Sequence, residues 1–214
     1  DPRQALAANS VVRLGTDGRD VHRHLEFLER WLAKLVALGA SAEERADVHL
    51  AMARAASTLP GRIDRALAHF REAHGLDGEL VQALDEGLEV ARKARRSNDV
   101  RAFLALLADA ERNGPRRIAL LRELGRERLS PPVDLEGAID AATAALALAP
   151  DDLGLLHELA TVLLTRAVRS RGTDAGKADL SRSADLLVEL ARRLPDDEAE
   201  PFLAMALDLV PTHP

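Results

Sequence analysis

The stretch LALAPDDLGLLHELATVLL, residues 146–164, decides the fold. An Ala/Leu-rich helix is expected to end at Pro150, because proline cannot continue a helix. Asp151 and Asp152 then place negative charge where the next helix begins. So short a break between two helices predicts antiparallel neighbours. If the same joint recurs at a fixed period, the chain is a helical repeat.

The composition favours helices throughout. The chain has 214 residues, of which 47% are apolar, and it contains no Tyr, one Trp and four Phe. Ala and Leu must therefore fill the core, and both are strong helix formers. No run alternates in the manner of a strand. The prediction is an all-α protein with helices near residues 3–13, 20–38, 42–57, 62–74, 78–96, 98–112, 115–129, 134–148, 152–170, 178–193 and 198–209.

Composition also excludes several classes of protein. There is no Cys, so disulfides, thiolate metal sites and Cys nucleophiles are excluded, and the compartment is left open with the cytoplasm favoured. No segment has 18 uncharged apolar residues, so no membrane span is predicted. A net charge of −6 argues against nucleic acid as a partner. The preference for Arg over Lys, with the abundance of Ala, is typical of a high-GC bacterial genome.

A period appears when the second helices of successive pairs are aligned. The segments RALAHFREA, RAFLALLADA and GAIDAATAAL place Ala66, Ala102 and Ala138 at intervals of 36 residues. A fourth copy at Ala184 follows a Gly- and charge-rich insert. The first helices repeat as well, with a Leu before a small residue in LLRELGRERL and LLHELATVLL. Such a small–large–small stripe suits a helix that crosses its neighbours closely.

This pattern resembles the tetratricopeptide repeat (TPR), best over 118–150 at Leu124, Gly125, Ala138, Ala145 and Pro150. The resemblance implies a right-handed α-solenoid of antiparallel helix pairs, about 10–11 helices in all. It divides the chain into an atypical or capping helical pair at 1–40, repeats at about 41–77, 78–113, 115–150 and 151–197, and a terminal helix at 198–214. The large aromatic residues that are usual in the first helix of a TPR are absent. In the repeat at about 78–113, Gly87 and Leu88 stand where a Leu followed by a small residue is expected. A globular Ala/Leu bundle with accidental spacing is the alternative.

No catalytic constellation is found, and no catalytic, cofactor or metal residue is predicted. The segment HELAT at 157–161 is half of a zincin helix, but Thr161 stands where the second His is needed. Neither a nucleophile elbow nor a phosphate loop occurs. The prediction is a protein without enzyme activity and without a cofactor.

The main charge cluster is basic. It comprises Arg92, Lys93, Arg95, Arg96, Arg101, Arg112, Arg116, Arg117, Arg122, Arg126 and Arg128. One interpretation is a clamp for a carboxylate, an acidic peptide or a phosphate, which Arg binds through paired hydrogen bonds. The other, which we favour, is solvated helix faces paired with Glu89, Glu111, Glu123 and Glu127. A protein that binds single-stranded nucleic acid needs aromatic side chains on which the bases stack, and this region has only Phe103.

The function expected from the resemblance is a non-catalytic protein–protein interaction scaffold. Its partner would be a protein or a peptide, with an acidic one as an option, bound on the concave wall formed by the first helices. The wall positions would be Arg45, Met52, Arg122, Arg126, His157 and Thr161. The alternative is a regulatory or sensor arm of a larger multidomain bacterial signalling or effector protein. The sequence leaves the oligomeric state open.

Stacked repeats predict a radius of gyration above that of a compact domain. For 214 residues the globular scaling law gives roughly 17 Å. Small-angle X-ray scattering should give a larger value, and a result at the globular value would favour the bundle instead.

Overall fold

The computed structural model describes residues 18–210, and these residues are helical, with no strand among them. The predicted helix at 3–13 lies outside this range. The helices are α2 (Gly18–Ala37), α3 (Ala42–Ser57), α4 (Ile63–Leu76), α5 (Val81–Lys93), α6 (Ser97–Ala110), α7 (Gly114–Leu129), α8 (Leu135–Leu148), α9 (Leu153–Arg169), α10 (Asp174–Ala191) and α11 (Asp196–Leu209). The all-α prediction is therefore confirmed, and most predicted helix ends lie within three residues of the observed ones. None of these helices is long and apolar enough to cross a bilayer.

The chain divides into two compact units between Ala110 and Glu111. The N-terminal unit contains α2 to α6, and the C-terminal unit contains α7 to α11. Within each unit the helices pack mainly on their neighbours in sequence, so each unit is built in the manner of a solenoid. The most extensive contacts are α3 with α4, α9 with α10 and α7 with α8, which are the predicted pairs.

Local signals in the sequence set the helix ends. Ser41 caps α3 in a capping box, in which its hydroxyl accepts from the Glu44 amide at 3.1 Å and Glu44 accepts from the Ser41 amide at 3.0 Å. Asp152 caps α9 by accepting from the Leu155 amide at 3.1 Å. Pro150 lies between α8 and α9, so the joint predicted at 146–164 is confirmed.

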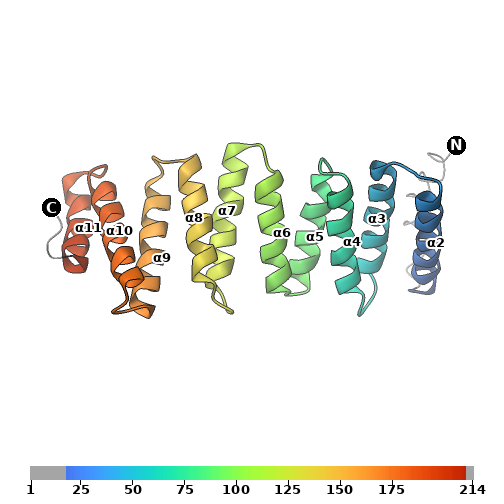
Figure 1. Ribbon diagram of the computed structural model, residues 1–214, viewed down its shortest axis with the longest axis horizontal. Coiled ribbons are helices and arrows are strands. Elements are labelled where there is room, and N and C mark those ends of the chain that lie inside the picture. The colour runs from blue at the N-terminus through green and yellow to red at the C-terminus, as the bar shows by residue number, and fades with distance from the viewer. Residues whose placement is uncertain (1–17, 211–214) are drawn as a thin grey trace. The chain divides into compact units, whose positions relative to one another are not determined.

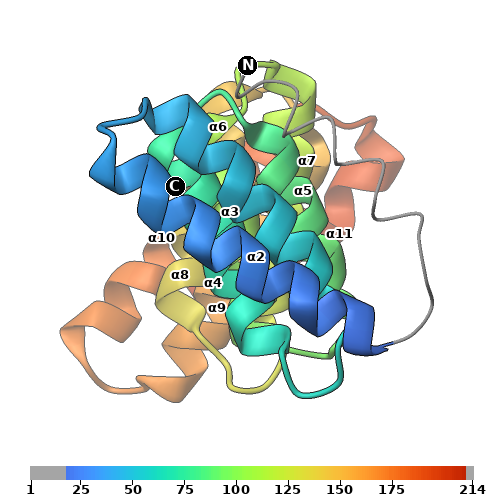
Figure 2. The same cartoon turned by 90° about the vertical axis from the view of Figure 1, so that its right-hand side faces the viewer.

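In the N-terminal unit, α2, α3 and α4 share one core. Figure 2 views this unit from the α2 end, with α2 in front of α3. Leu25, Leu28 and Leu35 of α2 pack on Val48 and Ala51 of α3, together with the side chains of Met52, Ala55, Ala56, Leu59 and Ala66. Met52 is only 2% exposed. Its predicted place on an exposed wall is wrong, because its apolar side chain lies on the stripe of α3 that faces this core.

The register expected for α6, in which Ala102 aligns with Ala66, is also wrong. Ala102 is only half-buried, whereas Ala66 is fully buried. The 4–3 spacing of Ala66, Phe70 and Ala73 in α4 is instead repeated by the buried residues Val100, Leu104 and Leu107 in α6. The reason is Phe103, which is fully buried against Gly87 of α5, where a Cβ would overlap its ring. Gly87, which departs from the repeat pattern, thus leaves room for the ring of Phe103 on the paired helix.

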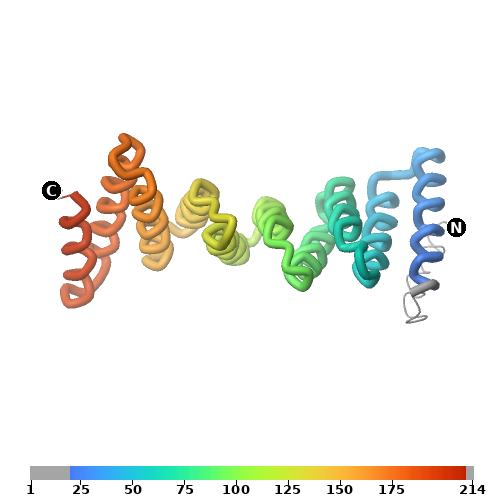
Figure 3. The backbone as a smooth tube through the Cα atoms, turned by 90° about the horizontal axis from the view of Figure 1, so that it is seen from below, coloured from blue at the N-terminus to red at the C-terminus, as the bar shows by residue number. Residues whose placement is uncertain are grey.

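The C-terminal unit stacks α7 to α11 in chain order (Figures 1 and 3). Ala138, Ile139 and Ala142 of α8 pack with Leu159, Val162 and Leu163 of α9. Helix α10 begins at Asp174 rather than near 178, because the Thr173 hydroxyl caps it by accepting from the Gly176 amide at 3.0 Å. The second half of the predicted insert, residues 174–179, therefore belongs to α10.

Replacing Gly87 with Ala should destabilise the N-terminal unit by about 1–3 kcal/mol, because the new methyl group would collide with the buried Phe103 ring. Gly125→Ala is the matched control. A Cβ there would lie 3.8 Å from the Ala138 carbonyl oxygen and from the Ala141 Cβ, which is ordinary contact. The control should be neutral or stabilising by up to about 1 kcal/mol, since Ala favours helix over Gly. Urea unfolding followed by circular dichroism measures both, and equal effects would contradict the packing described for Gly87.

Candidate functional site

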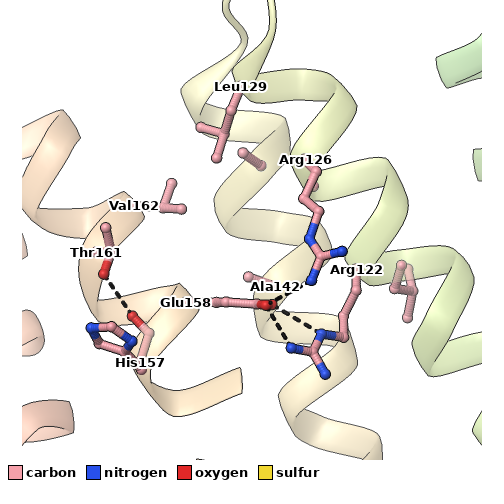
Figure 4. Close-up of a pocket in the computed structure, with 11 residues that line it drawn as sticks. Arg122, Arg126, Leu129, Ala142, His157, Glu158, Thr161 and Val162 are labelled. Atoms are coloured by element: carbon pink, nitrogen blue, oxygen red, sulfur yellow. Dashed lines mark hydrogen bonds and ion pairs between the residues drawn. The ribbon is translucent and has the colours of Figure 1, made fainter. Parts of the chain in front are cut away.

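Helices α7, α8 and α9 of the C-terminal unit surround a pocket of 290 Å³ (Figure 4). Helices α7 and α9 are the first helices of successive pairs, and α8 lies between them in sequence. The pocket is lined by Leu121, Arg122, Gly125, Arg126, Leu129, Ala138, Ala142, His157, Glu158, Thr161 and Val162. Most of this lining is apolar, with a few polar groups, as in many sites that bind an apolar side chain.

Four of the six predicted wall residues line this pocket. Arg122 and Arg126 come from α7, and His157 and Thr161 come from α9. Arg45 is half-buried in the N-terminal unit, where its Nε donates to the Ser41 carbonyl oxygen at 3.4 Å. Met52 lies in the core of that unit. The structure thus brings four of the predicted residues together in the C-terminal unit, whereas the other two belong to the N-terminal unit.

The two arginines hold a carboxylate of their own chain, that of Glu158 (Figure 4). Arg122 makes a bidentate pair, with Nε at 3.1 Å from Oε2 and Nη2 at 2.6 Å from Oε1. Arg126 adds a hydrogen bond from Nη2 to Oε1 at 3.2 Å. Arg122 Nη1 also lies 3.8 Å from Oδ2 of Asp152. Sequence reasoning missed Glu158, although its distance of 36 residues from Arg122 equals the repeat period.

These contacts shift the pKa values of the groups involved. Burial disfavours the charged form of Glu158, but the hydrogen bonds from Arg122 and Arg126 outweigh it and lower the pKa of the Glu158 carboxyl. The hydrogen bond to Glu158 raises the pKa of Arg122 in turn. Glu158 and Arg122 are therefore ionised at neutral pH, and together with Arg126 they form a bridge from α7 to α9.

The two remaining polar side chains that line the pocket, His157 and Thr161, are exposed. His157 lies edge-on to Phe202 of α11, with ring centroids 5.6 Å apart. The Thr161 hydroxyl donates to the His157 carbonyl oxygen at 2.9 Å, so its methyl group is what it offers to an apolar ligand. Among residues 18–210 no cluster of three His, Asp or Glu side chains has a geometry suited to a metal ion.

Bridges of the same kind recur between helices one repeat apart within each unit. Arg54 of α3 holds Glu86 of α5 in a bidentate pair at 2.7 and 2.6 Å. Further pairs of this kind join Arg65 to Glu29, Arg71 to Asp99, and Arg96 to Asp64. Several members of the predicted basic cluster are therefore paired with carboxylates, as the favoured interpretation expected. Arg96 pairs with Asp64, one repeat away, and with Asp99 at 3.3 Å, and Arg122 pairs with Glu158, one repeat away, so their partners differ from those predicted.

The N-terminal unit holds a chain of polar contacts through its centre. Arg65 of α4 pairs with Glu29 of α2, and its Nε donates to Nε2 of His69 at 3.5 Å. Nδ1 of His69 lies 3.1 Å from Nδ1 of His49 on α3. Burial, the neighbouring His49 and Arg65 together lower the pKa of His69 to about 4. Burial also lowers the pKa of His49.

Comparison with known proteins gives structural matches only. No protein-family model matches the chain, and neither does any curated protein. Among solved structures the chain is similar to YrrB, described as a TPR protein with an unusual peptide-binding site, at 18% identity over 78% of this chain and 88% of that one, with a TM-score of 0.36. It is also similar to kinesin light chain TPR-like repeats from Podospora anserina, at 15% identity, 80% and 89% coverage and a TM-score of 0.38. A third match is PilF of Pseudomonas aeruginosa, at 18% identity, 92% and 93% coverage and a TM-score of 0.33.

YrrB and the kinesin light chain structure are described as TPR and TPR-like. The predicted helix pairs, packed on their neighbours in sequence within each unit, are confirmed by the helix contacts of this chain itself. TM-scores of 0.38 or less carry no argument about a binding site or a partner of this chain.

The half-buried histidine pair, His49 and His69, predicts a loss of stability in acid. In the unfolded chain His69 has an ordinary pKa of about 6.5, whereas its pKa in the folded unit is about 4. Between these values the unfolded chain binds more protons, so the free energy of unfolding should fall as pH decreases from about 6.5 to about 4. His69→Gln cannot titrate and should show a smaller decrease between pH 7 and 5, measured by urea unfolding.

The control for this measurement is His157→Gln, which removes an exposed histidine from the other unit. It should retain the pH dependence of the wild type. An undiminished pH dependence in His69→Gln would contradict the role given to the pair.

Proposed function

We propose that the chain is a non-catalytic protein-interaction scaffold, and that a peptide or helix of a partner protein binds at the pocket between α7 and α9. The observation that carries this proposal is the pocket itself, which has an apolar lining and charged groups at its mouth. Peptide recognition by helical surfaces commonly uses an apolar anchor in a groove and polar contacts around it.

The lining suits an aliphatic side chain. Leu121, Leu129 and Val162 supply the larger apolar surfaces, and Ala138 and Ala142 leave the space between them open. Burying one such side chain of a partner contributes about 1.5–3 kcal/mol, which makes it an anchor rather than a complete interface. The remaining affinity would come from contacts along the exposed faces of α7 and α9, the first helices of their pairs.

The charges at the mouth support the expectation of an acidic partner. Arg126 is the most exposed member of the bridge, since 68% of its side chain is accessible. An exposed guanidinium beside an apolar pocket can hold a carboxylate through paired hydrogen bonds. The alternative function, a regulatory arm of a larger protein, would use the same pocket to sense its ligand, so one experiment bears on both.

Filling the pocket should abolish binding without loss of the fold. The Cβ of a residue at position 125 would have only ordinary contacts, so the side chain of Gly125→Leu can extend into the pocket. Affinity purification from the native host, with quantitative mass spectrometry, should show a partner that the wild type retains and the variant loses at least tenfold.

Gly75→Leu is the matched control, because Gly75 lies near the end of α4 in the other unit and has open space around it. It should retain the partner. The pocket would be ruled out as the binding site if both variants retained the partner equally while their circular dichroism spectra matched the wild type.

A further inference from the structure

The bridge at the pocket contains one arginine more than is needed to join α7 to α9. In the N-terminal unit the carboxylate of the equivalent bridge, that of Glu86, accepts from a single arginine, Arg54, and from the side-chain amide of Gln82 at 2.8 Å. In the C-terminal unit Arg122 alone makes the same bidentate pair with Glu158. Arg126 adds one longer hydrogen bond at 3.2 Å to an oxygen that Arg122 already contacts. The ion pair that joins α7 to α9 therefore does not depend on Arg126.

Arg126 has donors to spare. A guanidinium carries five N–H donors, and the bond to Glu158 uses one of them. Its side chain is 68% exposed, compared with 29% for Arg122. The positive charge of Arg122 is offset by Glu158 and, at 3.8 Å, by Asp152. The more accessible positive charge at the mouth of the pocket is thus that of Arg126.

Glu158 reaches across from α9 to the guanidinium groups on α7, beside the apolar lining (Figure 4). Its carboxylate occupies a place on Arg126 that a carboxylate from outside could take. Release of Glu158 from Arg126 would change the structure little, because the bidentate bond to Arg122 would hold the Glu158 side chain in place. The bond between Arg126 and Glu158 is therefore the one that a ligand can exchange.

We infer that Glu158 is an internal competitor for Arg126, and that the partner segment carries an apolar side chain for the pocket together with a carboxylate that replaces Glu158 on Arg126. This inference rests on the proposed function of the pocket. It adds the chemical class of the partner, an acidic amphipathic segment, and a residue that limits its affinity. Removing the Glu158 charge should strengthen binding, which a purely structural role of Glu158 would not do.

The test uses three blocked peptides with one sequence, acetyl-Ala-Leu-Ala-Ala-X-Ala-amide, in which X is Glu, Gln or Lys. Each peptide is titrated into the full ¹⁵N-labelled chain, and amide shifts of α7 and α9 give the affinity. The wild type should prefer the Glu peptide, with an affinity that falls as salt is raised because exposed charges are screened. In Glu158→Gln the Glu peptide should bind about twofold to fivefold more tightly, the range expected for one exposed ion pair.

Two variants make the result specific. Arg126→Gln, at an exposed position, should lose the preference for the Glu peptide over the Gln peptide. Glu86→Gln removes the equivalent bridge in the N-terminal unit and should leave all three affinities at their wild-type values.

The outcomes separate this inference from the function on which it rests. Equal binding of the Glu and Gln peptides would overturn the inference and leave the apolar pocket standing. A preference for the Lys peptide that Glu158→Gln weakens would overturn it in favour of a basic partner. If none of the three peptides shifts the amide signals of α7 and α9, that result would count against the pocket as a peptide site altogether.

Discussion

The structure depends on how closely helices can approach when the side chains between them are small. With four Phe, one Trp and no Tyr in 214 residues, the core is built largely from Ala and Leu. Ala66, Ala73 and Ala145 are completely buried on the second helices of their pairs. Small residues at such positions allow close helix contact. First helices of successive pairs then come near enough for an arginine on one to reach a carboxylate on the next, as Arg122 reaches Glu158.

The same small residues create the pocket. Gly125, Ala138 and Ala142 meet between α7, α8 and α9, and together with the larger Leu121, Leu129 and Val162 they leave a space of 290 Å³. A space of this size beside an exposed bridge is the feature of the C-terminal unit on which the proposed binding site rests.

Local chemistry made much of the fold predictable, and non-local contacts account for what was not. Ser41, Asp152 and Pro150 act within a few residues of themselves, so they fixed helix ends that the sequence shows directly. The register of α6 was missed because it depends on Phe103 meeting Gly87 on another helix. Met52 was misplaced because, around the axis of α3, the buried apolar positions lie next to the positions expected on the exposed wall. Glu158 was missed because its partner lies 36 residues away, although the repeat period could have indicated it.

The most direct test of this account is the coupling between Arg122 and Glu158, measured by a double-mutant cycle of Arg122→Gln and Glu158→Gln in urea unfolding. If the first helices of successive pairs are bridged as described, the coupling energy should be about 0.5–1 kcal/mol and should decrease with salt. Strictly additive effects of the two substitutions at low salt would mean that the side chains do not meet. The arrangement of α7 and α9 around the pocket would then be wrong.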